Sequence, residues 1–166
     1  SALTDTNKTA NLANTHSTLT YQGELRAHPW NFAKTRVQPA ADATAPIFGE
    51  ARKFALPSGF IRFADNSGKD DWRIEGQYIF TDDASPLDII YIQDVSDTDQ
   101  WDALFYDAVA CRMAVILAPW RTASRTKVED LEAQYTNAIR RAKQTNAIDN
   151  VPADPPEDSW ISVRRV

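Results

Sequence analysis

The segment LRAHPWNFA, residues 25–33, separates two parts of the sequence that follow different patterns. Before it, apolar residues recur at near-helical spacing and predict an amphipathic helix over residues 5–27. Pro29 ends this helix, because the residue before a proline is pushed out of the helical region. Trp30 and Phe32 follow directly. We predict that these two side chains pack where the first helix meets a sheet, rather than being exposed for binding.

After this segment the sequence predicts a β-lobe over residues 46–94, where prolines and glycines break any long helix. Residues 60–63, 72–80 and 87–92 predict strands of a small antiparallel sheet with about three or four strands. Gly76 lies in the middle of the second stretch and indicates a bulge or a sharp bend.

A second helix is predicted over residues 98–118. Asp97 or Thr98 would cap its start, and Pro119 would mark its end. Its apolar face is wide, which predicts a central and largely buried helix. Cys111 lies on this face and is interpreted as a small buried residue, not a nucleophile.

A third helix is predicted over residues 125–145, with Thr126 and Glu129 in capping-box spacing at its start. The predicted fold class is therefore α+β: a bundle of about three long helices, a small antiparallel β-lobe and an extended C-terminal arm. Residues 1–145 would form one domain and residues 146–166 the arm.

The arm combines a proline-rich, acidic first half with an apolar, alternating end. Such an end is unusual for a solvated tail, so we expect it to contact another surface, its own or a neighbour's. The candidate contact residues are Trp160, Ile161, Val163, Arg164 and Arg165.

Composition limits the function classes. The net charge of -5 argues against tight wrapping of nucleic acid, which needs clustered basic residues. The longest apolar run, residues 108–117, is too short to span a bilayer. With His16, His28 and one cysteine, the sequence predicts no metal site, and no nucleotide-binding or nucleophile-elbow motif occurs, so no cofactor or catalytic residue is predicted.

Adjacent carboxylates leave one enzymatic alternative open, a hydrolase that cleaves polysaccharide with a carboxylate pair. The pairs are Asp70-Asp71, Asp82-Asp83 and Glu129-Asp130. Their neighbours are turn formers and helix starts, so we interpret them as solvated turn and cap residues.

The segment from Leu25 to Ala33, followed by Arg36, closely resembles a hallmark of the tail tubular protein A family of short-tailed phages. Its most specific part is the motif formed by His28, Pro29, Trp30, Asn31, Phe32 and Ala33. Further similar segments follow in the same order, at residues 54–57, 74–81 and 87–92, and the ending around Trp160 is similar as well.

This resemblance implies a head-to-tail adaptor, or gatekeeper, that is a structural protein of the virion and is assembled in the host cytoplasm. It implies a ring of twelve subunits, with the portal protein on one side and the tail nozzle protein on the other. Genomic DNA would pass through the ring during ejection without specific binding, and no membrane would be involved. In such rings the C-terminal arm reaches the portal or a neighbour, and the motif at His28 has a structural role.

Two other interpretations remain open. In the first, the chain serves as the connector of a gene-transfer agent or of a longer-tailed particle, whose connectors share this fold; the hydrolase named above would likewise be virion-associated and act on cell-envelope polysaccharide. In the second, the chain is an interaction module unrelated to phage that acts through its C-terminal arm.

Overall fold

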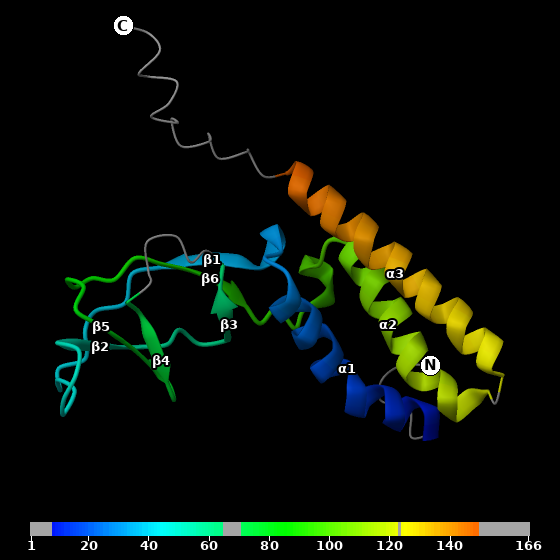
Figure 1. Ribbon diagram of the computed structural model, residues 1–166, viewed down its shortest axis with the longest axis horizontal. Helices are drawn as coiled ribbons and strands as arrows, with labels where there is room; N and C mark the ends of the chain where they lie inside the picture. The colour runs from blue at the N-terminus through cyan, green and yellow to red at the C-terminus, as the bar shows by residue number, and fades with distance from the viewer. Residues whose placement is uncertain (1–7, 65–70, 123, 150–166) are drawn as a thin grey trace, which may run out of the picture.

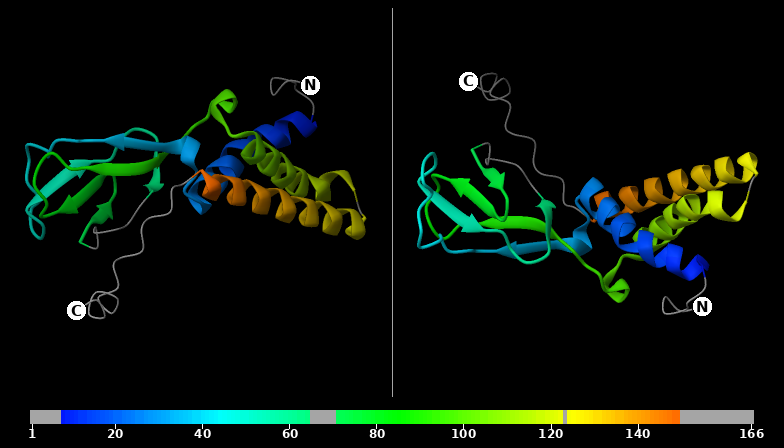
Figure 2. Two further views of the ribbon diagram at one scale, coloured as in Figure 1. Left: turned by 90° about the horizontal axis from the view of Figure 1, so that it is seen from above. Right: turned by 90° about the horizontal axis from the view of Figure 1, so that it is seen from below.

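The computed structural model describes residues 8–64, 71–122 and 124–149. Its shape is elongated, with a bundle of three helices at one end and a β-lobe at the other (Figures 1 and 2). The helices are α1 (Lys8–Ala27), α2 (Ala103–Arg121) and α3 (Arg125–Ile148). This confirms the predicted α+β class with three helices, whereas the C-terminal arm lies outside the described residues.

Helix α2 packs along α3 and also against α1, so it is the central helix of the bundle. Its start differs from the prediction. Asp102 caps it, because the Oδ1 atom accepts hydrogen bonds from the backbone N–H groups of Leu104 at 2.8 Å and Phe105 at 3.2 Å. Asp97 instead caps a short 3-10 helix, η2 (Thr98–Gln100), by accepting from the backbone of Asp99.

The end of α2 also corrects the prediction, since Pro119 lies inside the helix. A proline removes only one backbone donor, and in a last turn this loss does not stop a helix that is held by packing. Ala118 is buried, and its carbonyl accepts the backbone N–H of Thr122 at 2.9 Å. The helix therefore continues to Arg121.

The predicted capping box of α3 is wrong. The N-cap is Ser124, so Thr126 and Glu129 both lie within the helix, and Glu129 forms an ion pair with Arg125 at 3.2 Å. The helix also runs to Ile148, so residues 146–148 belong to it and not to the arm.

Within the described residues the β-lobe contains six short strands in two three-stranded antiparallel sheets, where the sequence predicted one sheet of three or four strands. The first sheet has the order β1-β6-β3 and the second the order β2-β5-β4. The strands are β1 (Lys34–Val37), β2 (Arg52–Ala55), β3 (Phe60–Phe63), β4 (Arg73–Glu75), β5 (Tyr78–Thr81) and β6 (Ile89–Gln93).

Two details correct the predicted lobe. It begins at Lys34 rather than at residue 46, because β1 pairs with β6, and Lys34 lies opposite Ile92. Residues 72–80 form two strands instead of one: Gly76 adopts a φ of +59°, which favours glycine, and turns the chain from β4 into β5.

Two clusters of buried side chains hold these parts together, and β6 contributes to both. Ile89 and Tyr91 face the core of the β-lobe with Phe54 and Ile79. Ile92 points to the opposite face of the strand and joins the core shared with the helices. The helical bundle and the lobe are therefore connected through one strand as well as through the chain at residues 28–33.

Candidate interaction surfaces

The motif from His28 to Ala33 forms the joint between α1 and β1, with residues Asn31–Ala33 in a short 3-10 helix, η1. Trp30 is 1% exposed, and its ring meets that of Phe105 on α2 edge to face, at 4.9 Å between centroids. Its Nε1–H donates to the backbone carbonyl of Glu24 at 2.8 Å, which satisfies the buried indole donor. Phe32 is half-buried and lies 4.9 Å from the same Phe105 ring. Both aromatic rings thus pack at the joint, as the sequence suggested.

Asn31 ties this joint to the far end of α3. Its backbone N–H donates to the Oδ1 atom of Asn146 at 2.7 Å, and its side-chain amide donates to the backbone carbonyl of Asn146 at 2.9 Å. The Nδ2 atom of Asn146 lies 3.1 Å from the Nε2 atom of His28. Asn146 is buried, so these bonds replace the water that its amide loses on folding.

His28 is half-buried against the edge of Trp30, with 4.8 Å between the ring centroids. Burial lowers the pKa of His28, and the positive charges of Lys143, Arg62 and Lys34 lower it further. The neutral ring is therefore favoured, and its Nε2 atom can accept from the Asn146 amide. These contacts give His28 a structural role in the joint.

A second polar contact joins the middle of the bundle. The Tyr135 hydroxyl on α3 donates to the Oε1 atom of Glu24 on α1 at 2.7 Å. The guanidinium of Arg112 on α2 lies 5.1 Å from the centre of the Tyr135 ring. Burial and the hydrogen bond to the Glu24 carboxylate raise the pKa of Tyr135 to about 12. All three helices thus meet at this tyrosine.

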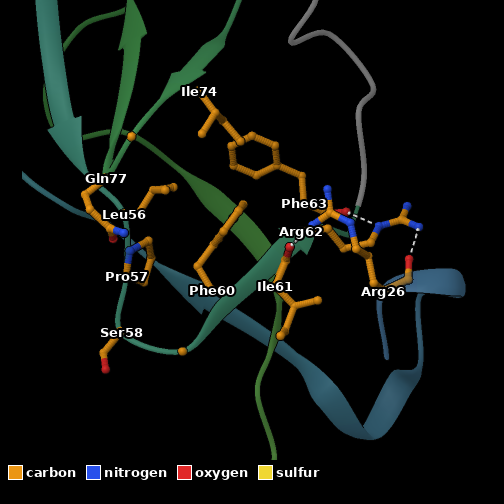
Figure 3. A pocket seen from close by; sticks show the side chains of 12 residues that line it. Arg26, Leu56, Pro57, Ser58, Phe60, Ile61, Arg62, Phe63, Ile74 and Gln77 are labelled. Atoms are coloured by element: carbon orange, nitrogen blue, oxygen red, sulfur yellow. Dashed lines mark hydrogen bonds between the residues drawn. The ribbon is translucent and has the colours of Figure 1, made fainter. Parts of the chain in front are cut away.

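A hollow of about 900 Å³ opens between the two sheets and the end of α1 (Figure 3). Figure 3 shows Arg26 and Arg62 on one side and Leu56 and Pro57 on the other. The two arginines are used structurally: Arg26 donates to the backbone carbonyl of Ile61 at 2.7 Å, and Arg62 donates to that of Arg26 at 3.1 Å. None of the described residues that line the hollow is acidic. Arg36, which also flanks the motif, is exposed on β1.

The carboxylate pairs occupy turns and a helix surface. Asp82 accepts a hydrogen bond from the backbone N–H of Ala51, and Asp83 accepts one from the Trp72 indole. Both aspartates are exposed, as are Glu129 and Asp130 on α3. Asp70 lies outside the described residues. Within the described residues no group of three His, Cys, Asp or Glu side chains is placed to hold a metal ion.

The apolar face of α2 is only partly covered, which corrects the prediction of a largely buried helix. Residues 113–117, which together go around the whole helix, are each partly exposed, and 22% of the residues in the apolar stretch of the helix are buried. By length and composition alone α2 would be able to cross a membrane, with a mean hydropathy of 1.4. Cys111 is half-buried rather than buried, and burial together with the negative charge of Asp107 raises the pKa of its thiol. The periodicity identified an apolar face, but α1 and α3 cover only part of it.

Large apolar side chains are exposed at both ends of the molecule. Ile47 and Phe48, which are 98% and 87% exposed, belong to the loop between β1 and β2. This loop lies at the outer end of the β-lobe, opposite the turn between α2 and α3 (Figure 1). Trp120, in the last turn of α2, is 71% exposed. These residues are not among those predicted from the sequence, although an apolar pair between Pro46 and Gly49 is a visible signal.

The C-terminal candidates Trp160, Ile161, Val163, Arg164 and Arg165 lie outside the described residues. Comparison with protein-family models gave no match, and comparison with curated proteins gave no significant relative.

Proposed function

We propose that this chain is a structural subunit of a phage virion, a head-to-tail adaptor. Such subunits would form a ring that joins the portal protein to the tail nozzle protein and lines the DNA channel. The observation that carries the proposal is the distribution of apolar surface on an elongated molecule: partly exposed apolar residues on α2 and exposed Ile47, Phe48 and Trp120 near opposite ends. The resemblance of the His28-to-Ala33 motif to the tail tubular protein A family supplies the class of assembly.

The partly exposed apolar residues of α2 could form a contact between identical subunits. A head-to-tail contact that closes after a fixed rotation gives a ring, and it joins two different patches of the same chain. The parts of the apolar side chains among residues 113–117 that are still exposed would then be removed from water by the neighbouring subunit. A monomer leaves this surface in water, which is unfavourable.

The exposed side chains at the two ends suit a subunit with different partners above and below the ring. A loop tip that carries Ile47 and Phe48 offers apolar area for a pocket on one partner. Trp120 offers a large aromatic side chain at the other end. The two ends carry different residues, so each would select its own partner.

Net charge fits the passage of DNA. Each subunit carries a formal charge of -5, so a closed ring is strongly acidic. Acidic walls repel phosphates and leave the genome free to move.

The hydrolase alternative needs two carboxylates that face each other across a cleft. In the described residues, Asp82 and Asp83 instead hold the backbone and the Trp72 indole at a turn.

Electron microscopy of the full chain, alone and mixed with the portal protein encoded in the same genome, tests the proposal. We expect a ring stacked coaxially on the portal. If that portal belongs to a gene-transfer agent or to a longer-tailed particle, the chain is the connector of such a particle instead of a short-tailed phage. A chain that stays monomeric and unbound in the presence of the portal would contradict the adaptor role. Association with detergent micelles in place of the portal would indicate that α2 faces a membrane instead.

A further inference from the structure

An apolar groove of about 470 Å³ lies between α2 and α3, close to the turn that joins them. Leu117 and Ala118 of α2 and Leu131 of α3 supply apolar side chains to it. Arg121, Lys127 and Asp130 also line it, and all three are exposed. The groove is open to water within the described residues, and apolar surface of this kind gains free energy when another side chain covers it.

One face of α3 connects this groove to the end of the helix. Lys127, Gln134, Arg141 and Ile148 follow one another at intervals of seven residues, and such positions stay on one side of a helix with a drift of about 20° per interval. Lys127 and Gln134 line the groove, and Ile148 is 81% exposed. The end of α3, to which residues 150–166 are joined in sequence, therefore carries the same face as the groove.

The length of this segment matches the distance to the groove. From Asp149 back to Leu131, α3 advances by about 27 Å at 1.5 Å per residue. From Asp149 forward to Trp160, an extended chain spans about 34 Å at 3.1 Å per residue. The difference of about 7 Å leaves room for the reversal of direction, and three prolines between residues 152 and 156 favour an extended chain.

The charges along the two paths are complementary between the end of α3 and the groove, whereas the groove itself holds Asp130 beside Arg121 and Lys127. Between the end of α3 and Trp160 the segment carries Asp154, Glu157 and Asp158 and no basic residue. The face of α3 carries Arg141 and Lys127, both exposed. In the antiparallel arrangement Asp154 comes about 15 Å from the start of the segment and Arg141 about 12 Å back along the helix, so the two lie at nearly the same level.

We propose that residues 150–166 fold back along the chain's own α3 and place the Trp160 side chain in the groove between α2 and α3. The tether keeps the segment at an effective concentration on the order of mM at this site, which favours its own chain over a second copy. This docking does not depend on the adaptor role. If the chain is an adaptor, a partner that binds residues 150–166 first has to displace them from the groove.

Disulfide trapping in the full chain tests this docking. The groove pair combines Ser159→Cys with Gln134→Cys, and the control pair combines Ser159→Cys with Glu132→Cys on the opposite side of α3, both with Cys111→Ala. Gln134 and Glu132 are both exposed, so neither cysteine disturbs the core. We expect the groove pair to form an intramolecular disulfide at least tenfold faster than the control pair under mild oxidation.

A third variant adds Trp160→Ala to the groove pair, and we expect its crosslinking rate to fall to that of the control. Equal rates in the groove and control pairs would overturn the proposal, as would a groove-pair rate that does not change with Trp160→Ala. Crosslinked dimers whose yield rises with protein concentration would overturn it too, because the segment would then dock on a neighbour. The assay needs no portal, so its failure leaves the microscopy test of the adaptor role unaffected.

Discussion

The side chain of Asn146, near the end of α3, accepts a hydrogen bond at 2.7 Å from the backbone N–H of Asn31, which lies 115 residues earlier in the chain. The side-chain amide of Asn31 donates a second hydrogen bond, to the backbone carbonyl of Asn146. This pair fastens the last helix to the turn between the first helix and the first strand. The joint is thereby closed by polar contacts as well as by the packing of Trp30.

Replacing Asn146 with alanine leaves the backbone N–H of Asn31 without this partner in a half-buried place. We expect Asn146→Ala to lower the free energy of unfolding by about 1–3 kcal/mol. Urea denaturation followed by circular dichroism measures it. Asn137→Ala on the exposed side of the same helix is the matched control and should change stability by less than about 0.5 kcal/mol. Equal effects of the two substitutions would contradict the role given to Asn146.

Trp30 contributes both volume and a buried donor to the joint. Trp30→Ala should cost about 3–5 kcal/mol, because it leaves a cavity beside Phe105. Trp30→Phe keeps most of the apolar contact but leaves the Glu24 carbonyl without the indole donor, and should cost about 1–3 kcal/mol. Trp120→Phe is the control, since Trp120 is 71% exposed. A Trp30→Phe chain as stable as the control would show that the hydrogen bond is dispensable.

Stability should fall on acidification below pH 6.5 in part because of His28. Its pKa is lowered in the folded chain, chiefly by burial, so the unfolded chain binds more protons just below pH 6.5. The contribution of neutral His28 is complete above that pH and decreases as the pH falls toward the folded-state pKa. Urea midpoints at pH 7.5 and 5.5 measure it. The drop should be smaller in His28→Gln than in the wild-type chain; an unchanged pH dependence in His28→Gln would contradict this role.

The loop tip with Ile47 and Phe48 should act in partner binding and not in stability. Both side chains are almost fully exposed, so Ile47→Ser with Phe48→Ser should change the unfolding free energy by less than about 0.5 kcal/mol. If a partner buries both side chains, the double variant should bind more than tenfold more weakly, because burial of each is worth about 1.5–3 kcal/mol.

Binding of the portal and of the nozzle protein, measured separately by biolayer interferometry, checks this expectation. The loss should be confined to one of the two proteins, because the tip lies at one end of the molecule. Thr44→Ala in the same loop is the control and should leave both affinities unchanged. If the double variant binds both proteins with wild-type affinity, the loop tip is not part of either contact surface.

The helices and the joint were accessible from sequence, because helical spacing and a proline stop are local signals. Trp30 is an example: its place follows from Pro29 and from the apolar stretches on either side. Strand β1 was not accessible, since Lys34-Thr35-Arg36-Val37 has one apolar residue and owes its conformation to pairing with β6. Asn146 was assigned to the arm for the same reason, because its partners are distant in sequence.

The exposed surfaces were the least predictable part. Helical spacing identifies the apolar face of α2, yet it cannot distinguish cover by α1 and α3 from cover by another molecule. Local sequence patterns also could not predict the number of sheets. Gly76 signalled a bend, but the division of six strands into two sheets depends on which strands pair.

Strand β6 has a mechanical consequence. Ile89 and Tyr91 are embedded in one core and Ile92 in the other, so displacement of the strand disturbs both. A force applied at the outer loop of the β-lobe is therefore transmitted along this strand to the helices. We expect the helical bundle and the β-lobe to unfold together, in a single step, when force is applied between that loop and the turn that joins α2 to α3.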